Sequence, residues 1–61
     1  MPVVHVEMFE GRTREQKREL VNKITEVFVD VTQCPPEAVT IIIQEMTKNN
    51  FAQAGKLYSD L

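Results

Sequence analysis

The fold of this 61-residue chain is decided by residues 39–46, which read VTIIIQEM. Three consecutive isoleucines at positions 41–43 make both faces of a strand apolar, because successive side chains point to opposite sides. Such a strand is typical of a parallel sheet covered by a helix. Pro35 and Pro36 stand before the run and forbid a continuing helix. We therefore predict a buried parallel strand over residues 39–46.

The segment before the two prolines is predicted to be one long helix. Thr13 and Gln16 match the capping-box pattern, so the helix is expected to begin at Thr13 and to end near Thr32 or Gln33. Its apolar residues recur at steps of one, three and four and define a single stripe, formed by Leu20, Val21, Ile24, Val27, Phe28 and Val31. Charged residues, Lys17 among them, are assigned to the outer face.

Residues 3–9, VVHVEMF, are predicted to form the first strand, and Gly11 breaks it. Strand, helix and strand then give one right-handed β-α-β unit. The tail over residues 47–61 contains the turn formers Asn49, Asn50 and Gly55 and is expected to form a short hairpin or an arm. The fold class is α/β (α+β), with one domain over residues 1–61.

The small size of the chain predicts that it assembles with copies of itself. A chain of about 60 residues buries only about 60% of the surface that its unfolded form exposes. The single Cys34 cannot form an intramolecular disulfide. Two-stranded sheets are marginal, and their open edges favour pairing with another chain. We expect dimerisation to complete the sheet in a homo-oligomer.

Composition and charge exclude several function classes. The net charge of −2 and the pI of about 5.2 give no basic face for nucleic acid. No apolar run approaches the roughly 20 residues of a membrane span, and no signal peptide opens the chain. One histidine, His5, and one cysteine make a poor metal site, so both are expected to be structural. An unpaired cysteine favours a cytoplasmic location.

Pro2, directly behind Met1, has two interpretations. Proline is tolerated at the first residue of a strand, where no ladder donor is needed. If Met1 is removed, however, Pro2 carries a terminal secondary amine, which can act as a base near neutral pH.

Several short motifs, taken together and in order, decide between these interpretations. They are Pro2, Glu10-Gly11-Arg12, Glu15-Gln16-Lys17, Ile42-Ile43, Glu45-Met46, Phe51 and Gly55-Lys56-Leu57. Over essentially its whole length the chain resembles the 4-oxalocrotonate tautomerase family, the short subgroup of the tautomerase superfamily. The resemblance implies β-α-β subunits that assemble as a homohexamer, a trimer of dimers.

The resemblance also implies an active site without metal or organic cofactor. Pro2 is the general base after removal of Met1, and Arg12 binds and polarises a substrate carboxylate. Phe51 lines the pocket, with Val4 and Ile42 as further apolar wall. Thr40 stands where better-studied members carry a second arginine, so a charge-assisted contact is missing. Three cations are candidates to compensate from a neighbouring subunit: Arg14, Arg18 and Lys48.

The expected reaction is tautomerisation of small unsaturated 2-hydroxy or 2-keto acids, such as 2-hydroxymuconate or phenylenolpyruvate. Because Thr40 brings no charge, we expect modest rates and a preference for the aryl acid. One alternative is a decarboxylase or hydratase of related acids that uses a cationic Pro2. The other is a non-enzymatic oligomeric binding protein with a vestigial pocket, and a retained Met1 would be its sign.

Overall fold

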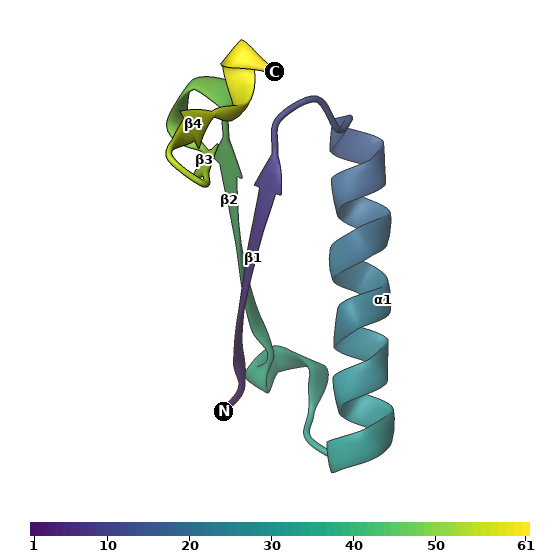
Figure 1. Ribbon diagram of the computed structural model, residues 1–61. Helices are drawn as coiled ribbons and strands as arrows, with labels where there is room; N and C mark the ends of the chain where they lie inside the picture. The colour runs from purple at the N-terminus through teal and green to yellow at the C-terminus, as the bar shows by residue number, and fades with distance from the viewer.

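The computed structural model describes residues 1–61 and forms a β-α-β unit. Strand β1 spans Val3–Phe9, helix α1 spans Arg14–Thr32, and strand β2 spans Thr40–Met46. The helix lies along one face of the two-stranded sheet, and the other face carries no layer (Figure 1). The predicted fold class is confirmed.

Local signals set both ends of α1. The hydroxyl of Thr13 accepts a 3.1 Å hydrogen bond from the amide of Gln16, whose side-chain oxygen accepts a 2.9 Å bond from the amide of Thr13. This reciprocal capping box satisfies donors that the first helical turn leaves free. At the other end Gln33 adopts a left-handed conformation (φ 61°), and its amide donates to the carbonyl of Val29 at 3.0 Å. The predicted helix boundaries are confirmed.

The two long strands pair in parallel, from Val3 beside Thr40 to Phe9 beside Met46. β2 begins at Thr40, one residue later than predicted. The reason is a 3₁₀ turn, η1, over Pro36–Ala38. The amide of Val39 donates a 3.1 Å hydrogen bond to the carbonyl of Pro36 in this turn, so it does not pair with β1.

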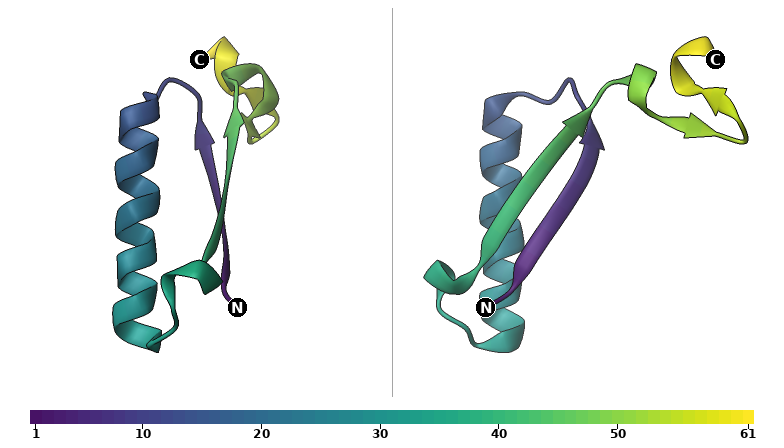
Figure 2. Two further views of the ribbon diagram at one scale, coloured as in Figure 1. Left: turned by 180° about the vertical axis from the view of Figure 1, so that it is seen from behind. Right: turned by 90° about the vertical axis from the view of Figure 1, so that its left-hand side faces the viewer.

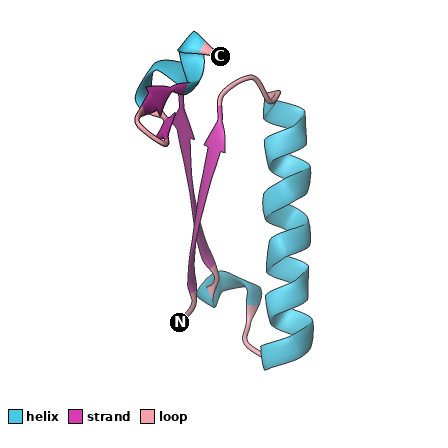
Figure 3. Ribbon diagram, viewed as in Figure 1, coloured by secondary structure: helices cyan, strands magenta, loops and turns pink.

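The tail forms an arm that contains a hairpin, as predicted (Figure 3). Short strands β3 (Ala52–Gln53) and β4 (Lys56–Leu57) pair antiparallel. Ala54 and Gly55 connect them with φ of 53° and 78°, the positive φ values that a type I′ turn requires. Two 3₁₀ turns flank the hairpin, η2 (Lys48–Asn50) and η3 (Tyr58–Asp60). Neither was predicted, because three residues carry no periodicity.

The sheet is covered on one face only. Side chains on the helix side are half-buried, and they alternate along both strands: Val4, Val6, Met8, Ile41 and Ile43. On the opposite face, Val3 is 62% and Ile42 is 48% exposed. The expectation that both faces of the isoleucine strand are buried is therefore wrong for a single protomer, which provides only one covering layer. No residue in the chain is fully buried.

The helix differs from its predicted faces at three positions. Val27 and Val31 belong to the apolar stripe, yet they are 60% and 77% exposed. Lys17, which was assigned to the outer face, turns toward the sheet and forms a 2.6 Å ion pair with Glu45. The stripe is wider than the narrow sheet beneath it, so part of its apolar surface has nothing to contact within the protomer.

The protomer is extended for its size. Its radius of gyration is 14.9 Å, whereas a compact chain of this length is expected near ~10.5 Å. Its accessible surface is 4954 Å², against ~4,000 Å² for a compact monomer of the same mass. The arm projects away from the sheet and accounts for much of this shape (Figure 2).

None of the helices combines the length and the apolar character that crossing a bilayer requires.

Candidate active site

Pro2 and Thr40 are neighbours at one end of the sheet. The amide of Thr40 donates a 3.0 Å hydrogen bond to the carbonyl oxygen of Pro2, which extends the ladder by one step beyond β1. Both residues are half-buried, whereas Met1 is 91% exposed. The structure therefore brings the predicted base and the position of the missing arginine together.

Arg12 lies at the other end of the sheet, after β1. The ladder continues to Glu10, whose amide donates to the carbonyl of Met46 at 3.0 Å. Gly11 then turns the chain with φ 116°, a conformation that side-chain-bearing residues rarely adopt. Arg12 follows, exposed, and none of the chain's three ion pairs includes it. Its guanidinium is free to bind an anion.

Phe51 belongs to the arm and lies at the same end as Arg12. It is half-buried, and its ring centroid is 5.2 Å from that of Phe9, the last residue of β1, and 5.3 Å from that of Tyr58. Sequence reasoning missed Phe9 and Tyr58 as neighbours of the predicted site. Their only signal was that three of the chain's four aromatic residues stand at a strand end or in the tail.

The predicted site residues thus divide into two half-sites at opposite ends of β1. The strand has seven residues, a length of about 23 Å. Pro2 and Thr40 lie at the end of the sheet near the N-terminus, whereas Arg12 follows β1 and Phe51 follows β2 at the other end, where the arm begins (Figure 1). The expected wall of Val4, Ile42 and Phe51 around Pro2 does not form within one protomer, because Phe51 lies beyond the far end of β2.

A cavity of about 300 Å³ lies at the end of the sheet that also carries Arg12 and Phe51, although neither of these two residues lines it. Six residues at the ends of β1 and β2 line it: Phe9, Glu10, Met46, Thr47, Lys48 and Asn49. It contains Lys48, one of the three cations considered as a substitute for the missing arginine. A second such cation, Arg18, is instead paired with Glu15.

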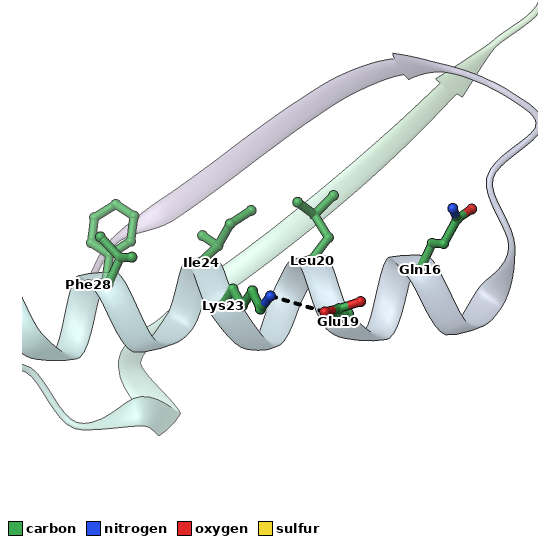
Figure 4. Close-up of a pocket in the computed structure, with 7 residues that line it drawn as sticks. Gln16, Glu19, Leu20, Lys23, Ile24 and Phe28 are labelled. Atoms are coloured by element: carbon green, nitrogen blue, oxygen red, sulfur yellow. Dashed lines mark ion pairs between the residues drawn. The ribbon is translucent and has the colours of Figure 1, made fainter.

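The largest groove, about 450 Å³, lies along α1 and away from these residues. Leu20, Ile24 and Phe28 point to the same side of the helix (Figure 4), and together with Val27 they form the apolar wall of the groove. Glu19 and Lys23 form a 3.0 Å ion pair on the neighbouring surface. The apolar stripe in the sequence was the signal for this groove.

His5 and Cys34 have structural surroundings. His5 Nε2 lies 3.0 Å from the side-chain oxygen of Gln44 on the uncovered face of the sheet. Cys34 lies just after α1, with its sulfur 3.9 Å from the carbonyl oxygen of Phe28. Neither residue lies in either half-site, in agreement with the structural role predicted for both.

Comparison with known proteins identifies the class to which this fold and this residue set belong. The family model described as Tautomerase enzyme matches residues 2–61. The 2-hydroxymuconate tautomerase of Bacillus subtilis is 49% identical over 61 residues, covering 100% of this chain and 98% of the relative. The enzymes of this class are isomerases.

Comparison with solved structures identifies the family within this class of enzymes. The crystal structure of YwhB, a homologue of 4-oxalocrotonate tautomerase, superposes with a TM-score of 0.91 at 48% identity and covers 98% of both chains. Another 4-oxalocrotonate tautomerase homologue gives a TM-score of 0.92 at 39% identity, covering 100% of this chain and 97% of the other. The chain belongs to the 4-oxalocrotonate tautomerase family, as the sequence motifs predicted.

Proposed function

We propose that this enzyme tautomerises small unsaturated 2-hydroxy or 2-keto acids, with the amine of Pro2 as the general base once Met1 is removed. The family match over residues 2–61 carries the proposal. The name of the Bacillus subtilis relative, 2-hydroxymuconate tautomerase, supports the substrate class. Phenylenolpyruvate is the aryl acid of the same class.

The proposed chemistry needs only a proton carrier. The neutral amine of Pro2 accepts the enol O–H proton, the C–O bond becomes a carbonyl, and the electrons of the C=C bond take a proton from the resulting ammonium at carbon. A terminal amine titrates near ~8, so a modest decrease of its pKa brings it close to neutral pH. An apolar enclosure and a nearby cation both favour the neutral form. A base with a pKa near the working pH is the efficient one.

Arg12 is the proposed carboxylate clamp. A guanidinium binds a carboxylate through two parallel hydrogen bonds and draws electron density toward it. The exposed, unpaired state of Arg12 in the protomer supports this role. Thr40, beside Pro2, supplies a hydroxyl but no charge. We therefore expect the enzyme to favour acids with one carboxylate over dicarboxylates.

A working site must draw its two halves from different subunits. Pro2 and Arg12 lie at opposite ends of a strand about 23 Å long, too far apart to act on one small acid. β1 pairs with β2 along one edge, and its other edge is free. Pairing of that edge with the same edge of a second copy, antiparallel about a two-fold axis, aligns each Pro2 with the partner's half-site of Arg12 and Phe51.

The uncovered surfaces support a larger homo-oligomer, and we propose the hexamer that the family resemblance implies. In the proposed assembly the free edge of β1 and the groove of α1 form one interface. In this interface the helix of a second copy covers Leu20, Ile24 and Phe28. The bare face of the sheet, with Val3 and Ile42 exposed, is left for a second contact. The unpaired thiol of Cys34 is compatible with the reducing conditions of the cytoplasm.

The proposal is tested by intact mass and a tautomerase assay on one sample. Ketonisation of phenylenolpyruvate or 2-hydroxymuconate is followed by absorbance, for the wild type and for Pro2→Ala. We expect a mass without methionine and a rate that Pro2→Ala lowers strongly, because the substitution replaces the secondary amine of proline with a primary amine. Processed protein that ketonises neither acid contradicts the proposed function. A preparation that retains Met1 is clipped with an aminopeptidase and assayed again.

A further inference from the structure

Three aromatic rings from distant parts of the sequence form one cluster at the Arg12 end of the sheet. Phe9 and Tyr58 stack with centroids 5.3 Å apart and an interplanar angle of 22°. Phe51 stands nearly perpendicular to both, at 79° to Phe9 and 83° to Tyr58, with centroids 5.2 and 5.3 Å away. These are the offset-stacked and edge-to-face geometries that aromatic pairs prefer.

The cluster ties the arm to the sheet. Phe9 is the last residue of β1, while Phe51 and Tyr58 stand on the two sides of the β3–β4 hairpin. The amide of Tyr58 donates a 2.8 Å hydrogen bond to the carbonyl of Phe51, which closes the hairpin at its base. The arm otherwise projects away from the sheet (Figure 2). Ring packing against Phe9 therefore fixes the direction in which Phe51 presents its ring.

We propose that Phe9 and Tyr58 are positioning residues that hold the ring of Phe51 as a wall of the active site. This inference rests on the proposed function, in which Phe51 lines the pocket that receives Pro2 of a neighbouring subunit. Phe9 also lies three residues before Arg12, so the cluster and the proposed carboxylate clamp follow the same end of β1. Neither Phe9 nor Tyr58 contacts substrate in this scheme; both act through Phe51.

The composition of the chain allows the ring to be observed directly. Phe51 and Phe9 share the chain with only one further phenylalanine, Phe28, and with a single tyrosine and no tryptophan. Phe28 lies on α1 outside the cluster, so its NMR ring resonances serve as an internal reference. Nuclear Overhauser contacts between the protons of Phe51 and those of its neighbours report where the Phe51 ring lies, without any activity assay.

The experiment compares Tyr58→Leu, which removes the ring, with Tyr58→Phe, which keeps it, and with Leu61→Ala as a control. Leu61 directly follows η3, the 3₁₀ turn that begins at Tyr58, and its apolar side chain is 79% exposed. We expect Tyr58→Leu to weaken the nuclear Overhauser contacts of the Phe51 ring with its remaining neighbours, to leave the resonances of Phe28 in place, and to lower kcat/KM for phenylenolpyruvate by about three- to tenfold. Tyr58→Phe and Leu61→Ala are expected to retain the wild-type spectrum and rate.

Phe9→Leu removes the other ring of the stack and gives the same expected result if Tyr58→Leu does not fold. Unchanged contacts of the Phe51 ring with its remaining neighbours in a folded variant overturn the inference, as does a displaced Phe51 ring with an unchanged kcat/KM in an active enzyme. If the processed wild type is inactive, the proposed function fails. The contacts of the Phe51 ring then decide separately whether the cluster holds the ring.

Discussion

The amide of Thr40 lies 3.0 Å from the carbonyl oxygen of Pro2, so the residue that replaces an arginine sits beside the proposed base. A substitution at this position therefore lies at the same end of the sheet as the proposed base. The backbone bond is independent of the side chain at position 40, which makes the position suitable for testing charge alone.

Thr40→Arg is expected to improve use of dicarboxylates. A charge-assisted hydrogen bond contributes about 2 kcal/mol, so kcat/KM for 2-hydroxymuconate should rise by roughly thirtyfold, with a smaller change for phenylenolpyruvate. Thr40→Lys is the matched control, because it adds the charge without the planar guanidinium of arginine. It should raise kcat/KM for 2-hydroxymuconate less than Thr40→Arg does. Steady-state kinetics measures kcat/KM for both acids and therefore the ratio of the two values in each variant. An equal effect on the two acids would argue against the assumed orientation.

The pH dependence of the reaction reports the protonation of Pro2. The base must be neutral, so kcat/KM should rise with pH and level off above the pKa of the amine, which we expect below the ~8 of a free terminus. A decarboxylase or hydratase that uses a cationic Pro2 would show the opposite trend, with activity lost as the amine deprotonates. An NMR titration of the proline nitrogen, read beside the pH–rate profile, separates the two.

Val27→Asp tests the groove of α1 as a contact between copies. Val27 is 60% exposed in the protomer, so the substitution costs the isolated subunit little. Within a contact it buries an unpaired charge, which weakens association by several kcal/mol. We expect sedimentation analysis to show smaller species for Val27→Asp, with Asn22→Asp, on the exposed side of the helix, unchanged. Identical masses for both variants would exclude the groove from the assembly.

Thr13→Ala removes the capping hydroxyl that accepts from Gln16 at 3.1 Å. The loss of such a cap costs about 1 kcal/mol of unfolding free energy. Thr47→Ala is the matched control, because Thr47 precedes the η2 turn without a side-chain capping bond. Urea unfolding at one fixed protein concentration compares the two, since assembly contributes to stability. Equal loss in both variants would mean that the capping box is not the cause.

The elements of the fold were predictable because short-range signals determine them. Thr13 with Gln16 marks the start of α1, and Pro35 with Pro36 separates it from β2. These effects act within a few residues, so no partner is needed to read them. Parallel pairing followed from the apolar isoleucine run.

What was not predicted depends on contacts distant in sequence or absent from the protomer. The Lys17–Glu45 ion pair spans 28 positions, and its helix-side placement follows only from the register of the sheet. Val31 and Ile42 looked like core residues, but they are exposed because a single protomer provides only one covering layer. Tyr58 reaches Phe9 only because the hairpin turns back.

The candidate site was also predictable only in part. The sequence indicated Pro2, Arg12, Phe51 and Thr40 by their match to the family motifs, but not their distribution over two ends of the sheet. That distribution is a property of the parallel β-α-β topology, which places residues 2 and 40 together and residues 12 and 51 far from them. It makes association part of the proposed mechanism.

In the proposed mechanism each active site combines Pro2 of one subunit with Arg12 of another, and mixing of two variant subunits measures this sharing. Pro2→Ala and Arg12→Ala are each purified, mixed in equal amounts, unfolded and refolded together, and assayed with phenylenolpyruvate. When the two variants assemble at random, about one quarter of the sites contain wild-type Pro2 together with wild-type Arg12. We therefore expect recovery of about a quarter of the wild-type rate. A mixture no more active than its two components, with wild type refolded in parallel and fully active, would contradict the shared site.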